Sequence, residues 1–140
     1  MSSNSIVLVE DDLNLRNSIA LILQRAGYFV TTTDCVSKAM DIIKAGNYQL
    51  VIADINMAET RKILLPNILM MKPRIAIVIL TDQSIPEIEK SDKLHRTHYL
   101  AKPIAPERLL DCVGTILGKQ TASRRNIDSL LLTDRNGSNQ

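Results

Sequence analysis

Short runs of apolar residues alternate along the chain with segments in which apolar residues recur every three or four positions. The runs predict β-strands, and the periodic segments predict helices. We expect strands over residues 6–9, 28–33, 50–53, 75–80 and 99–101. We expect helices over residues 13–26, about 35–45, about 86–94 and 106–117. This alternation predicts a parallel α/β sheet with helices on both faces.

Capping residues mark the ends of these helices. Asp34 or Ser37 is expected to cap the second helix, which Gly46 then ends. The third helix, between Asp54 and Pro73, has the least clear pattern because it contains Pro66. Proline lacks the backbone donor that a helix interior needs, so either a short helix begins near Pro66 or a longer one is kinked there.

The composition is that of one globular domain with an aliphatic core. The 140 residues are 45% hydrophobic and only 3% aromatic, with no tryptophan. Cys35 and Cys112 lack zinc-site spacing, so we expect two free, reduced thiols. No run approaches the ~20 apolar residues of a membrane helix, and residues 1–5 lack the features of a signal peptide. We therefore expect a cytoplasmic protein that does not insert into a membrane.

The net charge of +2 is confined to the last part of the chain. Residues 119–140 contain four basic and two acidic side chains, whereas residues 1–118 contain thirteen of each sign. We therefore expect one domain over residues 1–118 and a polar, mildly basic linker or C-terminal tail over residues 119–140. The neutral domain lacks the dense basic face of a nucleic-acid-binding protein.

Three consecutive acidic residues, Glu10, Asp11 and Asp12, follow the first strand and precede the first helix. Carboxylates this close repel one another unless a cation lies between them, and a hard divalent cation with oxygen ligands is the simplest such cation. In the alternative interpretation, Asp12 caps the helix, and its neighbours are solvated acids that interact favourably with the positive end of the helix dipole. The triplet alone leaves both interpretations open.

The other strand ends make the metal-binding interpretation stronger. Asp54 ends the third strand, Thr81 ends the fourth, and Lys102 follows the fifth. In a parallel sheet the carboxyl ends of the strands lie on one edge, where ligands bind. We therefore expect three acids, a hydroxyl group and a cation to meet in one shallow pocket.

Over about residues 5–118, the chain resembles the receiver domain of two-component response regulators. The resemblance rests on four segments: Val7-Leu8-Val9-Glu10-Asp11-Asp12, Ala53-Asp54-Ile55-Asn56-Met57, Ile79-Leu80-Thr81 and Tyr99-Leu100-Ala101-Lys102-Pro103. It implies a doubly wound, flavodoxin-like fold with five parallel strands in the order 2-1-3-4-5. It also implies that a sensor histidine kinase or a phosphotransfer protein phosphorylates an aspartate in the presence of Mg²⁺.

By this resemblance, Asp54 is the phosphoacceptor, a carboxylate nucleophile. Mg²⁺ would be held by Asp11, by Asp54, by Glu10 through water and by the backbone carbonyl of Asn56. This ligand set agrees with the preference of Mg²⁺ for one or two carboxylates, retained waters and phosphate oxygens. Because the metal neutralises charge, the transfer needs no separate general base.

The resemblance also implies a switch. Lys102 and Thr81 would each bind a phosphoryl oxygen, and Tyr99 would then turn inward. The resemblance places a cis peptide bond between Lys102 and Pro103. The rim of the pocket would be formed by Asp12, Asp82 and Pro103. The switch would alter the face formed by the fourth helix, fifth strand and fifth helix, which controls an output domain or partner and is also the expected homodimer surface.

The chain departs from the family pattern in four places, two of them single residues and two of them short segments. Ala58 stands where receivers commonly have proline, and residues 59–62 contain no glycine, so the turn after Asp54 must be built differently. Asp82 replaces a small residue after Thr81, which predicts slowed phosphorylation, slowed hydrolysis or both. Residues 94–98 replace a run of small residues before the last strand.

Three functions are compared. The first is a phosphorylation-switched receiver, which is not an enzyme beyond slow loss of its own phosphoryl group. The second is a degenerate pseudo-receiver that acts as a constitutive protein-interaction module, favoured by Asp82 and the missing glycine. The third is a phosphohydrolase of similar topology, which the order Glu10-Asp11-Asp12-Leu13-Asn14 disfavours. The chain has no phosphate-binding glycine loop, which argues against nucleotide enzymes.

Overall fold

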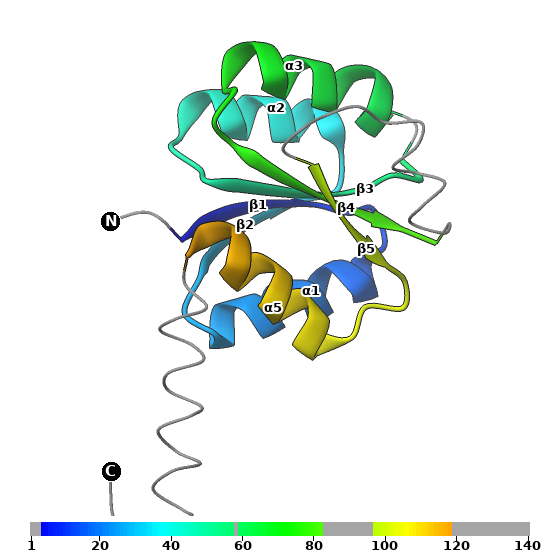
Figure 1. The fold of residues 1–140 in the computed structure, drawn as a ribbon. Helices are drawn as coiled ribbons and strands as arrows, with labels where there is room; N and C mark the ends of the chain where they lie inside the picture. The colour runs from blue at the N-terminus through cyan, green and yellow to red at the C-terminus, as the bar shows by residue number, and fades with distance from the viewer. Residues whose placement is uncertain (1–3, 58, 83–96, 119–140) are drawn as a thin grey trace, which may run out of the picture.

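The computed structural model describes residues 4–57, 59–82 and 97–118, and it contains one five-stranded parallel sheet in the order β2-β1-β3-β4-β5 (Figure 1). This is the predicted order, and the strand bounds agree with the predicted ones to within two residues. The strands are β1 (Ser5–Val9), β2 (Phe29–Thr33), β3 (Leu50–Asp54), β4 (Ala76–Thr81) and β5 (Thr97–Ala101). The helices are α1 (Leu13–Arg25), α2 (Val36–Ala45), η1 (Thr60–Leu64), α3 (Leu65–Met71) and α5 (Pro106–Leu117).

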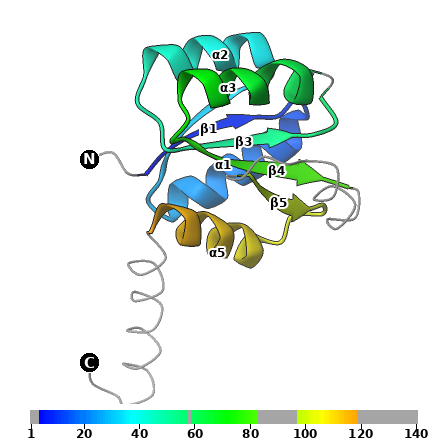
Figure 2. The ribbon, with the colours of Figure 1, turned by 45° about the horizontal axis from the view of Figure 1, so that its top comes forward.

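The helices cover both faces of the sheet. Helices α1 and α5 lie on one face, and α2 and α3 lie on the other, as both ribbon views show (Figures 1 and 2). Successive residues of a strand point to opposite faces. Ile6 and Leu8 of β1 therefore belong to one hydrophobic cluster, and Val7 and Val9 belong to another. Burial on both sides explains the unbroken apolar runs of the central strands.

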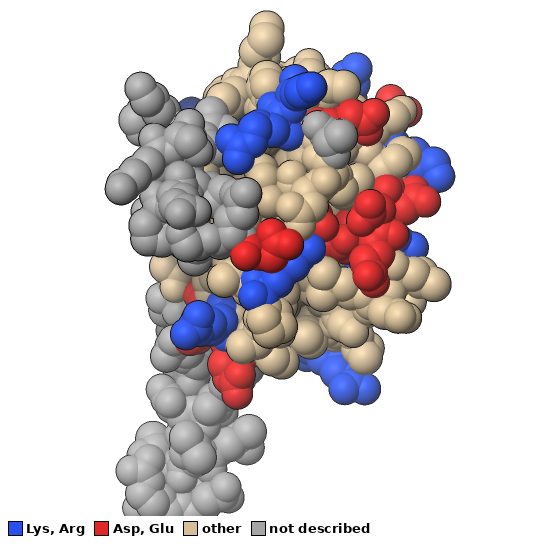
Figure 3. Space-filling view, turned by 90° about the vertical axis from the view of Figure 1, so that its right-hand side faces the viewer, with Lys and Arg blue, Asp and Glu red and all other residues tan. Residues whose placement is uncertain are grey.

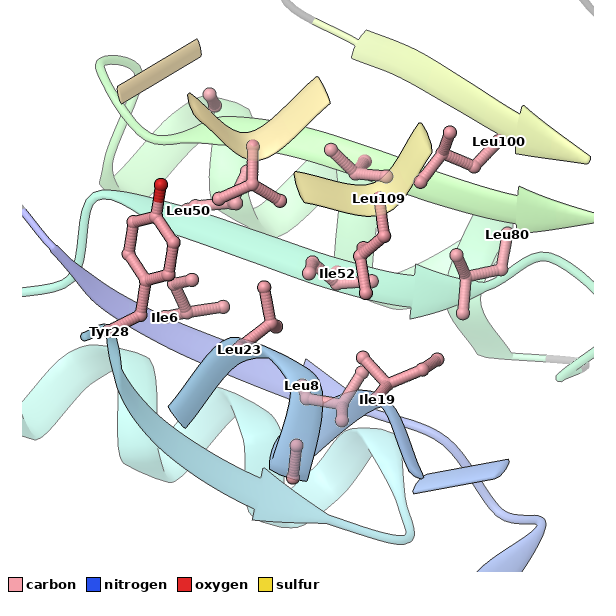
Figure 4. Packing of buried hydrophobic residues seen from close by; sticks show 14 residues of the cluster. Ile6, Leu8, Ile19, Leu23, Tyr28, Leu50, Ile52, Leu80, Leu100 and Leu109 are labelled. Atoms are coloured by element: carbon pink, nitrogen blue, oxygen red, sulfur yellow. The ribbon is translucent and has the colours of Figure 1, made fainter. Parts of the chain in front are cut away.

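Apart from Tyr28, the buried residues of the cluster beneath α1 and α5 are aliphatic, in line with the composition (Figure 4). Ile19 and Leu23 of α1 pack with Leu109 of α5 over the side chains of the central strands. The opposite cluster contains Ile43 of α2 and Ile68 of α3. These two layers fix the central strands, and hence the edge of the sheet at which they end.

One capping prediction is wrong. Neither Asp34 nor Ser37 caps α2, because the residue at the cap position is Cys35, whose side chain makes no capping hydrogen bond. The Cys35 amide instead donates to Oγ1 of Thr33 at 3.4 Å, and Asp34 lies 3.6 Å from Lys38 in an exposed ion pair. Sequence alone does not distinguish Asp34 from its neighbour, because a shift of one residue changes which side chain can reach the orphan amides.

The third helix begins before the proline. Thr60–Leu64 forms a wide π-type turn in which the Leu65 amide donates to the Thr60 carbonyl, and a short α-helix continues to Met71. Pro66 lies in the first turn of that α-helix, where its missing amide costs no interior hydrogen bond. The prediction of a short helix beginning near Pro66 is therefore confirmed for α3, but η1 precedes it.

Some predicted features lie outside the described residues: the helix over about residues 86–94, Ala58, the segment 94–96 and the tail over residues 119–140. No described helix is long and apolar enough to cross a membrane. Cys35 and Cys112 are free cysteines, and burial raises the pKa of the Cys112 thiol.

Candidate functional site

The carboxyl ends of the central strands bring the predicted site residues to one edge of the sheet. Asp54 is the last residue of β3 and pairs in register with Leu80, and Thr81 of β4 pairs with Ala101 of β5. Lys102 follows β5 directly, and its amide donates to the Thr81 carbonyl at 2.8 Å. The space-filling view of this end shows acidic side chains gathered beside basic ones (Figure 3).

Asp54 is buried and held by two donors. Only 4% of the residue is exposed. Its Oδ2 accepts a hydrogen bond from Lys102 Nζ at 2.9 Å, and its Oδ1 accepts one from the Asn56 amide at 2.9 Å. Burial lowers the pKa of Lys102, but the hydrogen bond and charge of Asp54, with the charges of Glu10 and Asp82, outweigh burial and raise it above its ordinary value. Lys102 is therefore the cation that balances Asp54 in this structure.

Glu10, Asp11 and Asp54 form a carboxylate cluster. One oxygen atom from each lies within 4.8 Å of the other two. Glu10 is fully buried; its Oε2 accepts from the Asp12 amide at 3.1 Å, whereas its Oε1 accepts no hydrogen bond from any described residue. Burial raises the Glu10 pKa to about 7; the hydrogen bond from Asp12 opposes this effect and the charge of Asp54 adds to it. The cluster therefore holds more negative charge than Lys102 alone balances.

A further carboxylate, that of Asp82, lies close to Lys102 at the end of β4. Asp82 is exposed, and its Oδ2 accepts a hydrogen bond from Asn56 Nδ2 at 3.4 Å. Asn56 therefore contacts Asp54 through its amide and Asp82 through its side chain. This bridge joins the loop after β3 to the end of β4, and the charge of Asp82 acts on Lys102.

The family model of the response regulator receiver domain matches residues 6–114, a range that contains all of these acids and all of the sheet except Ser5. The chain belongs to this family. Receiver domains are the response-regulator modules of two-component systems, so the resemblance found in the sequence is confirmed.

Similar proteins include two curated regulators and one chemotaxis protein. The DNA-binding transcriptional regulator NtrC of Bradyrhizobium sp. (strain RP501 Parasponia) is 30% identical over 122 residues, which cover 85% of this chain and 25% of NtrC. The aerobic respiration control protein ArcA of Escherichia coli (strain K12) is 27% identical over 137 residues, which cover 92% of this chain and 57% of ArcA. The structure of Vibrio cholerae chemotaxis protein CheY4 at low pH matches with a TM-score of 0.75 and 27% identity over 83% of this chain and 98% of CheY4. The chain therefore spans only part of the curated relatives, but almost the whole of CheY4.

The donor set of this receiver fits a divalent metal ion. Three carboxylates lie within 4.8 Å of one another, so two can bind Mg²⁺ directly and the third can bind through one of the waters that Mg²⁺ retains. The buried Oε1 of Glu10 is an acceptor without a described donor, and a metal-bound water can supply one. A cation here also relieves the repulsion that, with burial, holds the Glu10 pKa high. The residues present therefore fit Mg²⁺.

The structure confirms the capping interpretation for Asp12 and places Glu10 and Asp11 in the carboxylate cluster. Asp12 is the N-cap of α1, and its Oδ1 accepts from the Leu15 amide at 2.9 Å. Glu10, by contrast, is fully buried rather than solvated, and Asp11 belongs to the carboxylate cluster. The backbone carbonyl of Glu10 accepts from Arg16 Nη1 at 2.7 Å, which ties α1 to the end of β1. Capping and cluster formation are thus divided among neighbouring residues.

The remaining predicted residues lie in β4, in β5 or just after β5. Thr81 is fully buried at the end of β4. Tyr99 is half-buried in β5, where its ring packs against the cluster under α2 and α3. Pro103 is exposed, and the Lys102–Pro103 bond is cis, as the resemblance implies.

Sequence reasoning missed Thr60. This residue is fully buried, and its Oγ1 donates a hydrogen bond to the Asp54 carbonyl at 2.8 Å. The absence of glycine from residues 59–62 indicated that this turn is built differently, but it did not indicate which side chain builds it. The direction of the Thr60 hydroxyl depends on the π-type turn of η1, which no local pattern predicted.

Proposed function

We propose that this receiver is a phosphorylation-controlled switch in which Asp54 accepts a phosphoryl group from a phosphohistidine of a sensor histidine kinase or phosphotransfer protein. The observation that supports this most strongly is the placement of Asp54. Its carboxylate is buried at the end of β3, 2.9 Å from Lys102 Nζ and within 4.8 Å of the carboxylates of Glu10 and Asp11. A buried carboxylate that accepts a hydrogen bond from a lysine, and that lies within a cluster of acids able to hold a metal ion, is suited to nucleophilic attack on phosphorus.

In the proposed transfer, an oxygen of the Asp54 carboxylate forms a bond to phosphorus while the bond from phosphorus to the donor imidazole nitrogen breaks. The imidazole leaves and takes up a proton, so Asp54 becomes an acyl phosphate. Asp11, Asp54 and the Asn56 carbonyl would hold Mg²⁺ directly, and Glu10 would hold it through water; the bound ion would supply positive charge that offsets the acids and the phosphoryl oxygens. The Asn56 amide keeps the carboxylate oriented through its 2.9 Å hydrogen bond. Lys102 moves its contact from Asp54 to a phosphoryl oxygen.

The signal to an output domain or partner would depend on Thr81 of β4 and Tyr99 of β5. We propose that the Thr81 hydroxyl binds a second phosphoryl oxygen and that Tyr99 moves further inward from its half-buried position. These movements would change the surface formed by β5, α5 and the segment between β4 and β5. That surface would control an output domain or a separate partner protein, and it could also join two copies of the chain. Slow hydrolysis of the acyl phosphate would return the receiver to its resting state.

A pseudo-receiver that binds a partner constitutively is the second candidate. The Asp82 carboxylate, which accepts a hydrogen bond from Asn56, favours it, because a negative charge there would repel an anionic phosphodonor. The acceptor, the carboxylate cluster and Lys102 favour the switch instead. Phosphorylation of Asp54 by acetyl phosphate and Mg²⁺, and its loss in Asp54→Asn, would test the proposal directly.

A further inference from the structure

Buried polar residues in the described part of the chain are concentrated near the carboxyl edge of the sheet. They are Glu10, Thr33, Asp54, Thr60 and Thr81. Four of them end a strand or follow one directly, whereas Thr60 belongs to a helical turn six residues beyond Asp54. Burial of a hydroxyl group is unfavourable unless the group is hydrogen-bonded. The hydrogen-bond partner of the Thr60 hydroxyl therefore indicates the structural role of this buried side chain.

That partner is the backbone carbonyl of Asp54, which accepts two hydrogen bonds. The Thr60 hydroxyl donates at 2.8 Å, and the Met57 amide donates at 3.2 Å. The next amide, that of Ile55, donates to the Leu80 carbonyl of β4 at 2.9 Å. The peptide group between Asp54 and Ile55 is therefore fixed at both ends. Its carbonyl is held by Met57 and Thr60, and its amide is held by β4.

The backbone of Thr60 is fixed as firmly as its side chain. Its amide donates to the Met57 carbonyl at 3.0 Å, and its carbonyl accepts from the Leu65 amide across the π-type turn. Leu64, at the end of η1, is fully buried in the cluster under α2 and α3. The turn contains no glycine, so no residue in it has the conformational freedom that glycine supplies. The Thr60 hydroxyl thus connects the peptide group of Asp54 to a turn that is anchored at both ends by buried residues, Thr60 and Leu64.

We propose that Thr60 is a positioning residue for the phosphoacceptor, which sets the direction of the Asp54 side chain by holding the carbonyl group of the same residue. This inference rests on the proposed function of Asp54. The Thr60 hydroxyl bonds to the backbone of Asp54, not to its carboxylate, so its effect is on geometry. In-line transfer and octahedral metal binding both depend on a carboxylate held close to its productive orientation.

The test compares Thr60→Val, which replaces the hydroxyl with a methyl group of similar size, with Thr60→Ser, which keeps the hydroxyl. The initial rate of Asp54 phosphorylation by saturating acetyl phosphate is measured by intact-protein mass spectrometry, and Mg²⁺ affinity is measured by calorimetry. We expect the valine variant to react roughly fivefold more slowly, the factor that one neutral hydrogen bond of ~1 kcal/mol corresponds to. We expect it also to bind Mg²⁺ more weakly. The serine variant should restore both values.

Thr33→Val is the matched control. Thr33 is also buried near this edge, but its hydroxyl bonds to the backbone of Cys35 rather than to Asp54. Loss of the Thr33 hydroxyl should lower the free energy of unfolding without changing the rate of Asp54 phosphorylation or the Mg²⁺ affinity. Equal slowing in Thr33→Val and Thr60→Val would show a general effect of stability and overturn the inference.

The remaining outcomes are also decisive. If wild type is phosphorylated on Asp54 and Thr60→Val matches it in rate and Mg²⁺ affinity, the inference is wrong while the proposed function stands. If wild type is not phosphorylated on Asp54, the proposed function itself fails. If Thr60→Val and Thr60→Ala both fail to fold while Thr60→Ser folds, the hydroxyl serves folding rather than positioning, and the inference is again overturned.

Discussion

The ammonium group of Lys102 lies 2.9 Å from Oδ2 of Asp54, although the two residues are 48 positions apart in the chain. The contact exists because β3 and β5, on either side of β4, end at the same edge of the sheet. Lys102 therefore occupies the space beside a carboxylate that we propose as a ligand of Mg²⁺. A monovalent and a divalent cation at one carboxylate repel each other.

Replacing Lys102 with glutamine should strengthen Mg²⁺ binding. The substitution removes the positive charge but leaves Asp54, Glu10 and Asp11, so we expect the Kd for Mg²⁺ to fall by roughly three- to tenfold, an order of magnitude consistent with one charge pair near a protein surface. Calorimetric titration at low ionic strength measures this change. Lys44→Gln, in the last turn of α2, should leave the Kd unchanged. Weaker binding in Lys102→Gln would mean that Lys102 supports the metal site rather than competing with it.

Glu10 should make metal-free stability depend on pH. Burial first, and then the charge of Asp54, raise its folded-state pKa from 4.5 to about 7, while the hydrogen bond from Asp12 partly offsets them. The folded protein therefore binds more protons than the unfolded chain between these values. The stabilisation is complete below pH 4.5 and is lost as the pH rises through about 7. We expect the free energy of unfolding, measured with urea and a chelator, to fall by up to about 3 kcal/mol across this range.

Glu10→Gln should remove most of that pH dependence. Saturating Mg²⁺ should also reduce it in wild type, because the metal stabilises the ionised carboxylate. Mg²⁺ affinity should in turn weaken below about pH 7, where a proton on Glu10 must first be displaced. A wild-type unfolding profile that is flat without metal would show that Glu10 is not protonated in this range.

Asp82 should slow the entry of small anionic phosphodonors. Asp82→Asn removes the charge but keeps the size, whereas Asp82→Ala removes both. If charge dominates, both variants should react with acetyl phosphate roughly three- to tenfold faster than wild type, and added salt should narrow the difference. Asp34→Asn is the control, because Asp34 follows β2 and pairs with Lys38 at 3.6 Å. Faster reaction in the alanine variant alone would assign the effect to bulk, and no change in either would assign Asp82 no role at the entrance.

Substitutions of Asp12 and of Asp11 should affect different properties, the first the stability of the fold and the second the affinity for Mg²⁺. Asp12→Ala removes the N-cap of α1 and should lower the free energy of unfolding by about 1 kcal/mol while leaving Mg²⁺ affinity almost unchanged. Asp11→Asn should do the reverse, with at least tenfold weaker Mg²⁺ binding and no loss of metal-free stability, because it removes repulsion from the cluster. Thermal or urea unfolding and calorimetry on the same samples measure both effects. Loss of Mg²⁺ binding in Asp12→Ala would assign Asp12 to the metal site instead of the cap.

The apolar runs predicted the strands and the edge at which the acids meet, because burial on both faces leaves unbroken apolar runs and parallel strands end together. The order of the strands came from the resemblance to receiver domains. The helix after Asp34 was predicted, but its cap was not, since capping depends on a shift of one residue. The Asn56–Asp82 bridge and the Thr60 hydrogen bond were not predicted either. The bridge joins two loops that are distant in sequence, and the Thr60 hydrogen bond depends on the π-type turn of η1. Neither contact leaves a periodic pattern in the sequence.

The most direct test of the central claim is intact-mass and peptide mass spectrometry of wild type, Asp54→Asn and the surface control Asp41→Asn after incubation with acetyl phosphate and Mg²⁺. We predict a single phosphoryl group on Asp54 in wild type, the same modification in the control, and none in Asp54→Asn or in wild type treated with a chelator. Circular dichroism and urea unfolding confirm that each variant is folded. A phosphoryl group retained in folded Asp54→Asn, or none on wild type at saturating Mg²⁺, would contradict the account.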